Sequence, residues 1–110
     1  MKTYLQGIAV GFISLLLSLS LHASQVVEVG QKDKQFSQST LTVKKGDTVR
    51  FVNNDPFFHN VFSLSDAKLF DLGSYPQGEY RDVEFDQSGT VEVECALHPS
   101  MTLTIEVTDK

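Results

Sequence analysis

Short runs of alternating apolar and polar residues cover most of the chain from residue 25 onward. Alternation is typical of a strand with one face in a core, because successive side chains of a strand point to opposite faces. This part of the chain has no helical period of useful length. The runs predict strands at Val26–Val29, Phe36–Lys44, Thr48–Asn53, His59–Leu64, Glu79–Phe85, Thr90–Cys95 and Met101–Thr108.

Turn residues separate these runs and set their ends. Residues 45–47 and 87–89 each contain a glycine and are expected to form tight turns, and the segment Asn53–Pro56 ends a strand because proline cannot donate to a ladder. Residues 65–78 contain two glycines and a proline, so we expect a crossing loop there with one helical turn near Asp66–Phe70. Many short strands separated by turns predict an all-β sandwich.

The two C-terminal runs show the alternation best. Cys95 has the same parity as the valines of residues 90–95, and Met101 has the same parity as the apolar residues of 101–108. Both sulfur-containing side chains are therefore expected to point into the core. Residues 96–100 would then form the loop between the two strands, at one end of the sandwich.

The first 23 residues differ in character from the rest of the chain. Lys2 is followed by an apolar run that is strongest from Ile8 to Leu19, and Ala23 supplies a small residue at the expected cleavage point. This pattern predicts a secretory signal peptide, residues 1–23, ahead of one domain, residues 24–110. The alternative is an uncleaved membrane anchor, which the short apolar run disfavours because a spanning helix needs about 20 apolar residues.

Removal of the predicted signal peptide changes the formal charge of the chain, while the single cysteine stays in the exported domain. Eight basic and fourteen acidic side chains remain, for a formal charge of −6. Such an acidic surface argues against a nucleic-acid partner and favours basic partners, on which charge acts mainly through the association rate. The single cysteine has no partner for a disulfide within the chain, so it would pair between chains, react as a free thiol or bind a metal.

The segment CALHPSM, residues 95–101, supports the metal-bound alternative. Cys95, His98 and Met101 place a thiol, an imidazole and a thioether within seven residues, and they can converge on one ion if the segment is a short loop between strands. Soft sulfur ligands select copper, and imidazole suits copper as well, so copper is the expected metal. His59 is the only other histidine outside the predicted signal peptide and is the candidate for the missing ligand.

Each of these residues, taken singly, has an ordinary structural explanation. A lone cysteine or methionine on an apolar face is usually part of the core, and a lone histidine usually lies at the surface. Together, however, the one cysteine and both histidines of the predicted domain form an ordered copper pattern with a methionine in the remaining position. Zinc also takes cysteine and histidine, but a methionine as fourth ligand disfavours it.

The predicted domain resembles the cupredoxin family of blue copper proteins, and among its members the small periplasmic ones such as amicyanin, plastocyanin and pseudoazurin. Four features carry the resemblance: KKGDTVRFVNND at 44–55, HN at 59–60, the strand of alternating valine and acidic residues before Cys95, and C-x2-H-P-x-M at 95–101. The resemblance covers most of residues 25–108. It implies a Greek-key β-sandwich of seven or eight strands.

The resemblance also implies a ligand set. His59 and His98 match the two imidazole ligands of the family, Cys95 matches the thiolate and Met101 matches the axial thioether. Asn60 matches an asparagine whose main-chain N–H reaches the cysteine sulfur and whose side chain ties the two ligand loops together. Such contacts orient the ligands and tune the metal.

The function implied is that of a small exported protein that binds one copper ion, as Cu(I) or Cu(II), and shuttles single electrons. It would be a periplasmic monomer whose mature chain does not insert into the membrane. Its partners would be redox proteins, such as a c-type cytochrome or an amine dehydrogenase.

Two other classes of function fit the sequence less well. A copper chaperone or storage protein that hands over Cu(I) would favour several exposed methionines or histidines, which the chain lacks. A copper enzyme, such as a nitrite reductase or an oxidase, needs further histidines for a second copper site. The predicted domain has no histidine beyond His59 and His98, so we expect no enzymatic activity.

Overall fold

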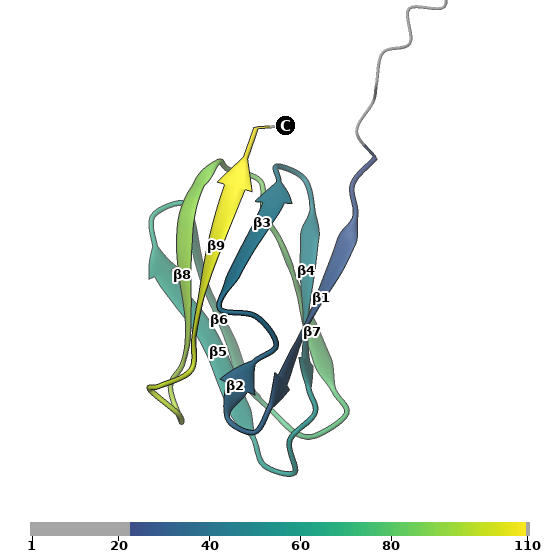
Figure 1. Ribbon diagram of the computed structural model, residues 1–110, viewed down its shortest axis with the longest axis vertical. Helices are drawn as coiled ribbons and strands as arrows, with labels where there is room; N and C mark the ends of the chain where they lie inside the picture. Colours follow the sequence, from purple (N-terminus) through teal and green to yellow (C-terminus); the bar gives the residue numbers. More distant parts are fainter. Residues whose placement is uncertain (1–22, 110) are drawn as a thin grey trace, which may run out of the picture.

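The computed structural model describes residues 23–109, which form nine strands in two facing sheets (Figure 1). One sheet has the order β2-β1-β4-β7 and the other has the order β3-β9-β8-β5-β6. The strands are β1 (Val26–Lys32), β2 (Gln35–Phe36), β3 (Thr40–Lys44), β4 (Thr48–Asn53), β5 (His59–Ser65), β6 (Lys68–Tyr75), β7 (Tyr80–Glu84), β8 (Gly89–Cys95) and β9 (Thr102–Thr108). The predicted all-β sandwich is confirmed, with nine strands in place of seven or eight.

The described residues contain no helix of the length and apolar composition that crossing a membrane requires. The predicted signal peptide, residues 1–23, lies almost entirely outside the described residues.

The core lies between the two sheets, and the alternation in the sequence decides which side chains enter it. Along β8, Val91, Val93 and Cys95 are buried, while Glu92 is exposed and Glu94 is only partly covered. The same parity holds along β9 and β5. The buried apolar residues are Val29, Phe36, Val43, Val49, Phe51, Val61, Tyr75, Val83, Phe85, Val91, Val93, Cys95, Met101, Leu103, Ile105 and Val107.

The run Phe36–Lys44 is not the single strand that its pattern predicts. It divides into β2, which pairs with β1 in the four-stranded sheet, and β3, which pairs with β9 in the five-stranded sheet. The segment between them crosses from one sheet to the other, and Ser37 N–H still donates to Gly30 O in the first sheet. A change of sheet keeps the extended backbone and the local alternation, so a local pattern does not reveal it.

Residues 65–78 are not the expected crossing loop, and there is no helical turn near Asp66–Phe70. Instead β6 runs antiparallel to β5 and forms the edge of the five-stranded sheet. Gly73, which favoured a loop, has a φ of 67° and lies where the β5–β6 register shifts. It is therefore a bulge residue within a strand, a position where a left-handed conformation suits glycine.

The antiparallel pairing of β5 with β8 brings two distant segments to one end of the sandwich. Val61 pairs with Cys95, so the start of β5 lies beside the end of β8. The loops 54–58 and 96–101 therefore lie at the same end, at the bottom of Figure 1. This end carries the candidate site.

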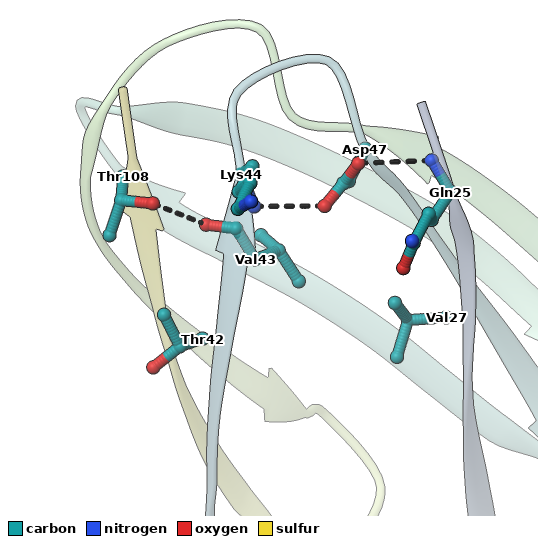
Figure 2. A pocket seen from close by; sticks show the side chains of 7 residues that line it. All are labelled: Gln25, Val27, Thr42, Val43, Lys44, Asp47 and Thr108. Atoms are coloured by element: carbon teal, nitrogen blue, oxygen red, sulfur yellow. Dashed lines mark hydrogen bonds between the residues drawn. The ribbon is translucent and has the colours of Figure 1, made fainter. Parts of the chain in front are cut away.

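Asp47 lies at the opposite end of the sandwich, in the turn between β3 and β4, where it lines a pocket (Figure 2). The residue is 4% exposed, and its carboxylate accepts hydrogen bonds from the main-chain N–H groups of Gln25, at 3.0 Å, and Lys44, at 2.9 Å. These bonds hold the turn to the chain segment that enters β1. The carboxylate thus serves the fold at a point remote from the candidate site.

Candidate metal centre

Three side chains with metal-binding atoms meet at the end of the sandwich where β5 begins and β8 ends. His59 opens β5, Cys95 closes β8, and His98 lies in the loop that follows. Cys95 Sγ lies 3.6 Å from His59 Nδ1 and 3.8 Å from His98 Nδ1. The ligand atoms of the three residues all lie within 4.8 Å of one another, so they could hold a single ion.

The chemistry of this donor set fits copper. One thiol and two imidazoles, each presenting Nδ1, supply the trigonal His₂Cys set of blue-copper sites. His59 and Cys95 are fully buried or nearly so, and His98 is only partly covered. The cluster is therefore shielded from water at His59 and Cys95, and solvent can reach it at His98.

The orientation of His59 is fixed from behind by a buried carboxylate. Its Nε2 lies 2.7 Å from Oδ2 of Asp55, and both residues are at most 2% exposed. Because an ionised carboxylate only accepts hydrogen bonds, Nε2 carries the proton and donates it. The other ring nitrogen, Nδ1, faces Cys95 and is the atom of the ring that a metal ion could bind.

The electrostatics favour this arrangement. Burial alone would raise the pKa of Asp55, but the hydrogen bond from His59 and those from the main-chain N–H groups of Lys34 and Asp33 lower it, and the net pKa lies below the usual value. Asp55 is therefore ionised. Burial lowers the pKa of His98, and the neighbouring His59 and Lys34 lower it further, so the His98 ring is kept neutral and able to donate a lone pair.

Asn60 connects the two ligand-bearing segments through its main chain. Its N–H lies 3.5 Å from Cys95 Sγ, the contact that the resemblance implies. Its carbonyl accepts a hydrogen bond from Ala96 N–H at 2.9 Å. The side chain does not make the expected tie, because Oδ1 of Asn60 is buried and accepts no hydrogen bond from the described residues. The main-chain carbonyl links the loops in its place.

Met101 and Phe57 complete the surroundings of the cluster. Met101 is 1% exposed, directly precedes β9, and donates its main-chain N–H to His98 O at 2.9 Å. The ring of Phe57 lies 5.4 Å from the His59 ring and 5.3 Å from the His98 ring, centroid to centroid. Both imidazoles are thus packed against one aromatic side chain, which restricts their rotation.

The sequence reasoning missed Asp55. It assigned this residue only to the turn that ends β4. The local signal was an aspartate four residues before the candidate ligand His59, a separation that a looped-back segment can close. A carboxylate bonded to the second ring nitrogen of a metal-binding histidine is a common partner in metal sites.

Comparisons with known proteins agree with this geometry. A chloroplastic plastocyanin of Chlamydomonas reinhardtii is 39% identical over 75 residues, which are 66% of this chain and 47% of that protein. The methylamine utilization protein MauL of Methylorubrum extorquens is 27% identical over 112 residues, covering 100% of this chain and 98% of that one. A solved structure of a reduced amicyanin variant superposes with a TM-score of 0.70 at 23% identity, covering 80% of this chain and 87% of that one.

The chain thus spans about half the length of its plastocyanin relative and nearly the whole length of MauL. The family model described as copper binding proteins, plastocyanin/azurin family, matches residues 23–108, which include every candidate ligand. The chain therefore belongs to the plastocyanin/azurin family of copper-binding proteins.

Proposed function

We propose that this chain is a one-electron carrier that holds one copper ion by His59, Cys95, His98 and Met101. The observation that supports this most directly is the convergence of the only cysteine with both histidines of the domain in one cluster, of which only His98 is partly exposed. Membership of a copper-binding family supports the choice of metal. Met101 joins the ligand set because it is buried directly beside the loop that carries His98.

A bound copper ion supplies the one-electron chemistry, since it is stable as Cu(I) and as Cu(II). The protein supplies ligands that are already in place. His59 and Cys95 lie on neighbouring hydrogen-bonded strands. The carboxylate of Asp55 contacts His59, and the main-chain N–H of Asn60 contacts Cys95. Ligands held this firmly change position little between oxidation states, so little reorganisation accompanies electron transfer.

The path for electrons leads through His98. It is the ligand in the loop and the only one of the three clustered side chains that is not fully buried. Phe58 and Leu97, both about half exposed, provide apolar surface next to the ligands in sequence. A small apolar surface around an accessible ligand suits brief encounters, which bury little area.

The remaining assignments follow from charge and sequence. The chain would act in the periplasm after export by its predicted signal peptide, as a monomer with basic redox partners such as a c-type cytochrome or an amine dehydrogenase. The acidic charge would speed encounter with such a partner. The described residues hold a single cluster of metal-binding side chains, which supports a carrier rather than an enzyme with two copper sites or a copper store.

The experiment that tests the function is an absorption spectrum followed by a redox titration. The purified chain, loaded with one equivalent of Cu(II), is expected to develop the intense blue band of a thiolate–copper centre. It should lose that band on addition of one electron per copper and regain it on oxidation. A colourless Cu(II) complex, or a blue form that releases its copper on reduction, would contradict the proposal.

Charge introduced next to His98 should slow electron transfer without altering the copper centre. Leu97→Asp places a carboxylate on an exposed residue of the ligand loop, and like charges that face each other in an encounter complex oppose docking. Self-exchange between reduced and oxidised copies, measured by NMR line broadening, should fall about tenfold at low salt.

The matched control is Leu69→Asp. Leu69 is 71% exposed but lies on the edge strand β6, opposite Leu64 and toward the end of the sandwich remote from His98. The Leu69→Asp substitution adds the same net charge as Leu97→Asp and should leave the self-exchange rate near that of the wild type. Equal slowing by both substitutions would mean that net charge, and not the surface around His98, controls the encounter.

A further inference from the structure

Asp55 connects the candidate ligand His59 to a turn in another part of the fold. One carboxylate oxygen, Oδ1, accepts the main-chain N–H of Asp33 at 2.7 Å. The other, Oδ2, accepts the main-chain N–H of Lys34 at 3.1 Å and lies 2.7 Å from His59 Nε2. The carboxylate is therefore fully engaged between the turn on one side and the imidazole on the other.

The turn itself adopts a conformation that needs support. Asp33 and Lys34 form the two-residue connection between β1 and β2, and their φ angles are 54° and 56°. Two left-handed residues in succession define a turn that normally uses asparagine, aspartate or glycine. Asp33 suits its position but Lys34 does not, so the hydrogen bond from Lys34 N–H to Asp55 helps hold an unfavourable backbone conformation.

Asn53, two residues earlier in the chain, also fixes the position of Asp55. Its main-chain N–H donates to Oδ1 of Asn53 at 2.8 Å. The Nδ2 of Asn53 donates to Phe57 O at 2.8 Å and to Tyr75 O at 2.9 Å. Asn53 is fully buried. The loop that carries Asp55 is thus anchored to the strand before it, to its own far end and to β6.

A second contact runs from the same turn to the same site. The ammonium group of Lys34 lies 5.6 Å from the centre of the Phe57 ring, which packs against both candidate imidazole ligands. The β1–β2 turn therefore touches the site through a carboxylate and through an aromatic ring. Both contacts act on the side chains behind the ligands.

We propose that Asp55 is a positioning residue for the metal centre: held by the β1–β2 turn, its buried carboxylate keeps the proton of His59 on Nε2, presents Nδ1 to the copper and places a negative charge behind the ligand. This inference rests on the proposed copper function. A fixed negative charge near the ion favours Cu(II) over Cu(I), so the carboxylate lowers the reduction potential as well as orienting the ring.

The test replaces the charge and keeps the shape. In the copper-loaded protein, Asp55→Asn should shift the equilibrium toward Cu(I) about tenfold, which is about 59 mV for a one-electron couple. It should also weaken copper binding about 10- to 100-fold, the usual effect of removing such a partner. In the metal-free protein, ¹⁵N NMR of the imidazoles should find the proton of His59 on Nε2 in the wild type.

Asp47→Asn is the matched control. Asp47 is also a buried aspartate that accepts two main-chain N–H groups in a turn, but it lies at the opposite end of the sandwich. Both substitutions should lower the melting temperature, because both remove a carboxylate that anchors a turn. Only Asp55→Asn should move the potential. Equal potentials in the two variants and the wild type would overturn the inference.

Other outcomes separate this inference from the function on which it rests. A wild-type protein that binds no copper overturns the proposed function, while the imidazole spectrum of the metal-free chain still tests the role of Asp55. A His59 ring that carries a proton on Nδ1 and none on Nε2 in that spectrum would overturn the inference alone. If Asp55→Asn fails to fold, Asp55→Glu carries the test: the retained charge should keep the potential near the wild-type value, and a tenfold shift would contradict the proposal.

Discussion

Replacing Cys95 by serine is expected to abolish the blue colour of the copper-loaded protein completely. The intense band of a blue-copper site depends on a thiolate bound to the metal, and Cys95 is the only cysteine of the chain. A serine hydroxyl is a harder donor that does not deprotonate at neutral pH, so copper binding should also weaken. Absorption spectra and competition against a chelator measure both losses.

The effect on folding must be separated from the effect on the metal. Cys95 is 1% exposed and lies among the valines of β8, so a hydroxyl there loses its hydration and should cost about 1–3 kcal/mol of stability in the metal-free protein. Cys95→Ala removes the sulfur without burying a polar group, and it should be equally colourless but more stable than the serine variant. A blue protein from either variant would mean that another group binds the copper.

The strand pattern placed the sulfur atoms correctly because parity is a local property. Cys95 and Met101 are buried on the faces that their neighbours indicate, since side chains two residues apart share a face whatever the rest of the fold does. The proximity of Cys95 and His98 was equally predictable, because the two residues are only three positions apart in a short loop. What followed from local chemistry could therefore be predicted.

The errors arose where the outcome depends on distant segments. The strand β6 was mistaken for a loop because a glycine such as Gly73 is common both in turns and in bulges within strands. Only the pairing of β6 with β5 shows which of the two it is. The run Phe36–Lys44 was mistaken for one strand because its division depends on two partners, β1 and β9. Neither partner can be identified from the local alternation.

Asp55 was missed for a related reason. A turn-forming sequence explains an aspartate before Pro56 without any further role, and nothing nearby in the chain shows that residues 33 and 34 will supply two N–H groups to its carboxylate. The separation in sequence is more than 20 residues. The contacts of Asp55 are made by segments that only the fold brings together, whereas the candidate ligands are recognisable from their own chemistry.

Removing the copper is expected to lower the melting temperature substantially. The metal-free cluster leaves two imidazoles and a thiol at one end of a small sandwich, with no metal to join β5 to the loop after β8. A ligand that binds only the native state stabilises it by about 4 kcal/mol when its free concentration is a thousandfold above the Kd. For a domain of this size that corresponds to a rise of roughly 15–30 °C on loading.

Thermal scans at a series of copper concentrations would measure this effect. The melting temperature should keep rising with the logarithm of free copper after the site is full, because the stabilisation follows mass action. Cys95→Ala is the control, since it should show only the small change caused by copper bound elsewhere on an acidic surface. A fully blue wild type whose melting temperature matches that of the metal-free chain would mean that the unfolded chain binds copper equally well. The cluster would then owe nothing to the preorganisation by Asp55, Asn60 and Phe57 that the fold provides.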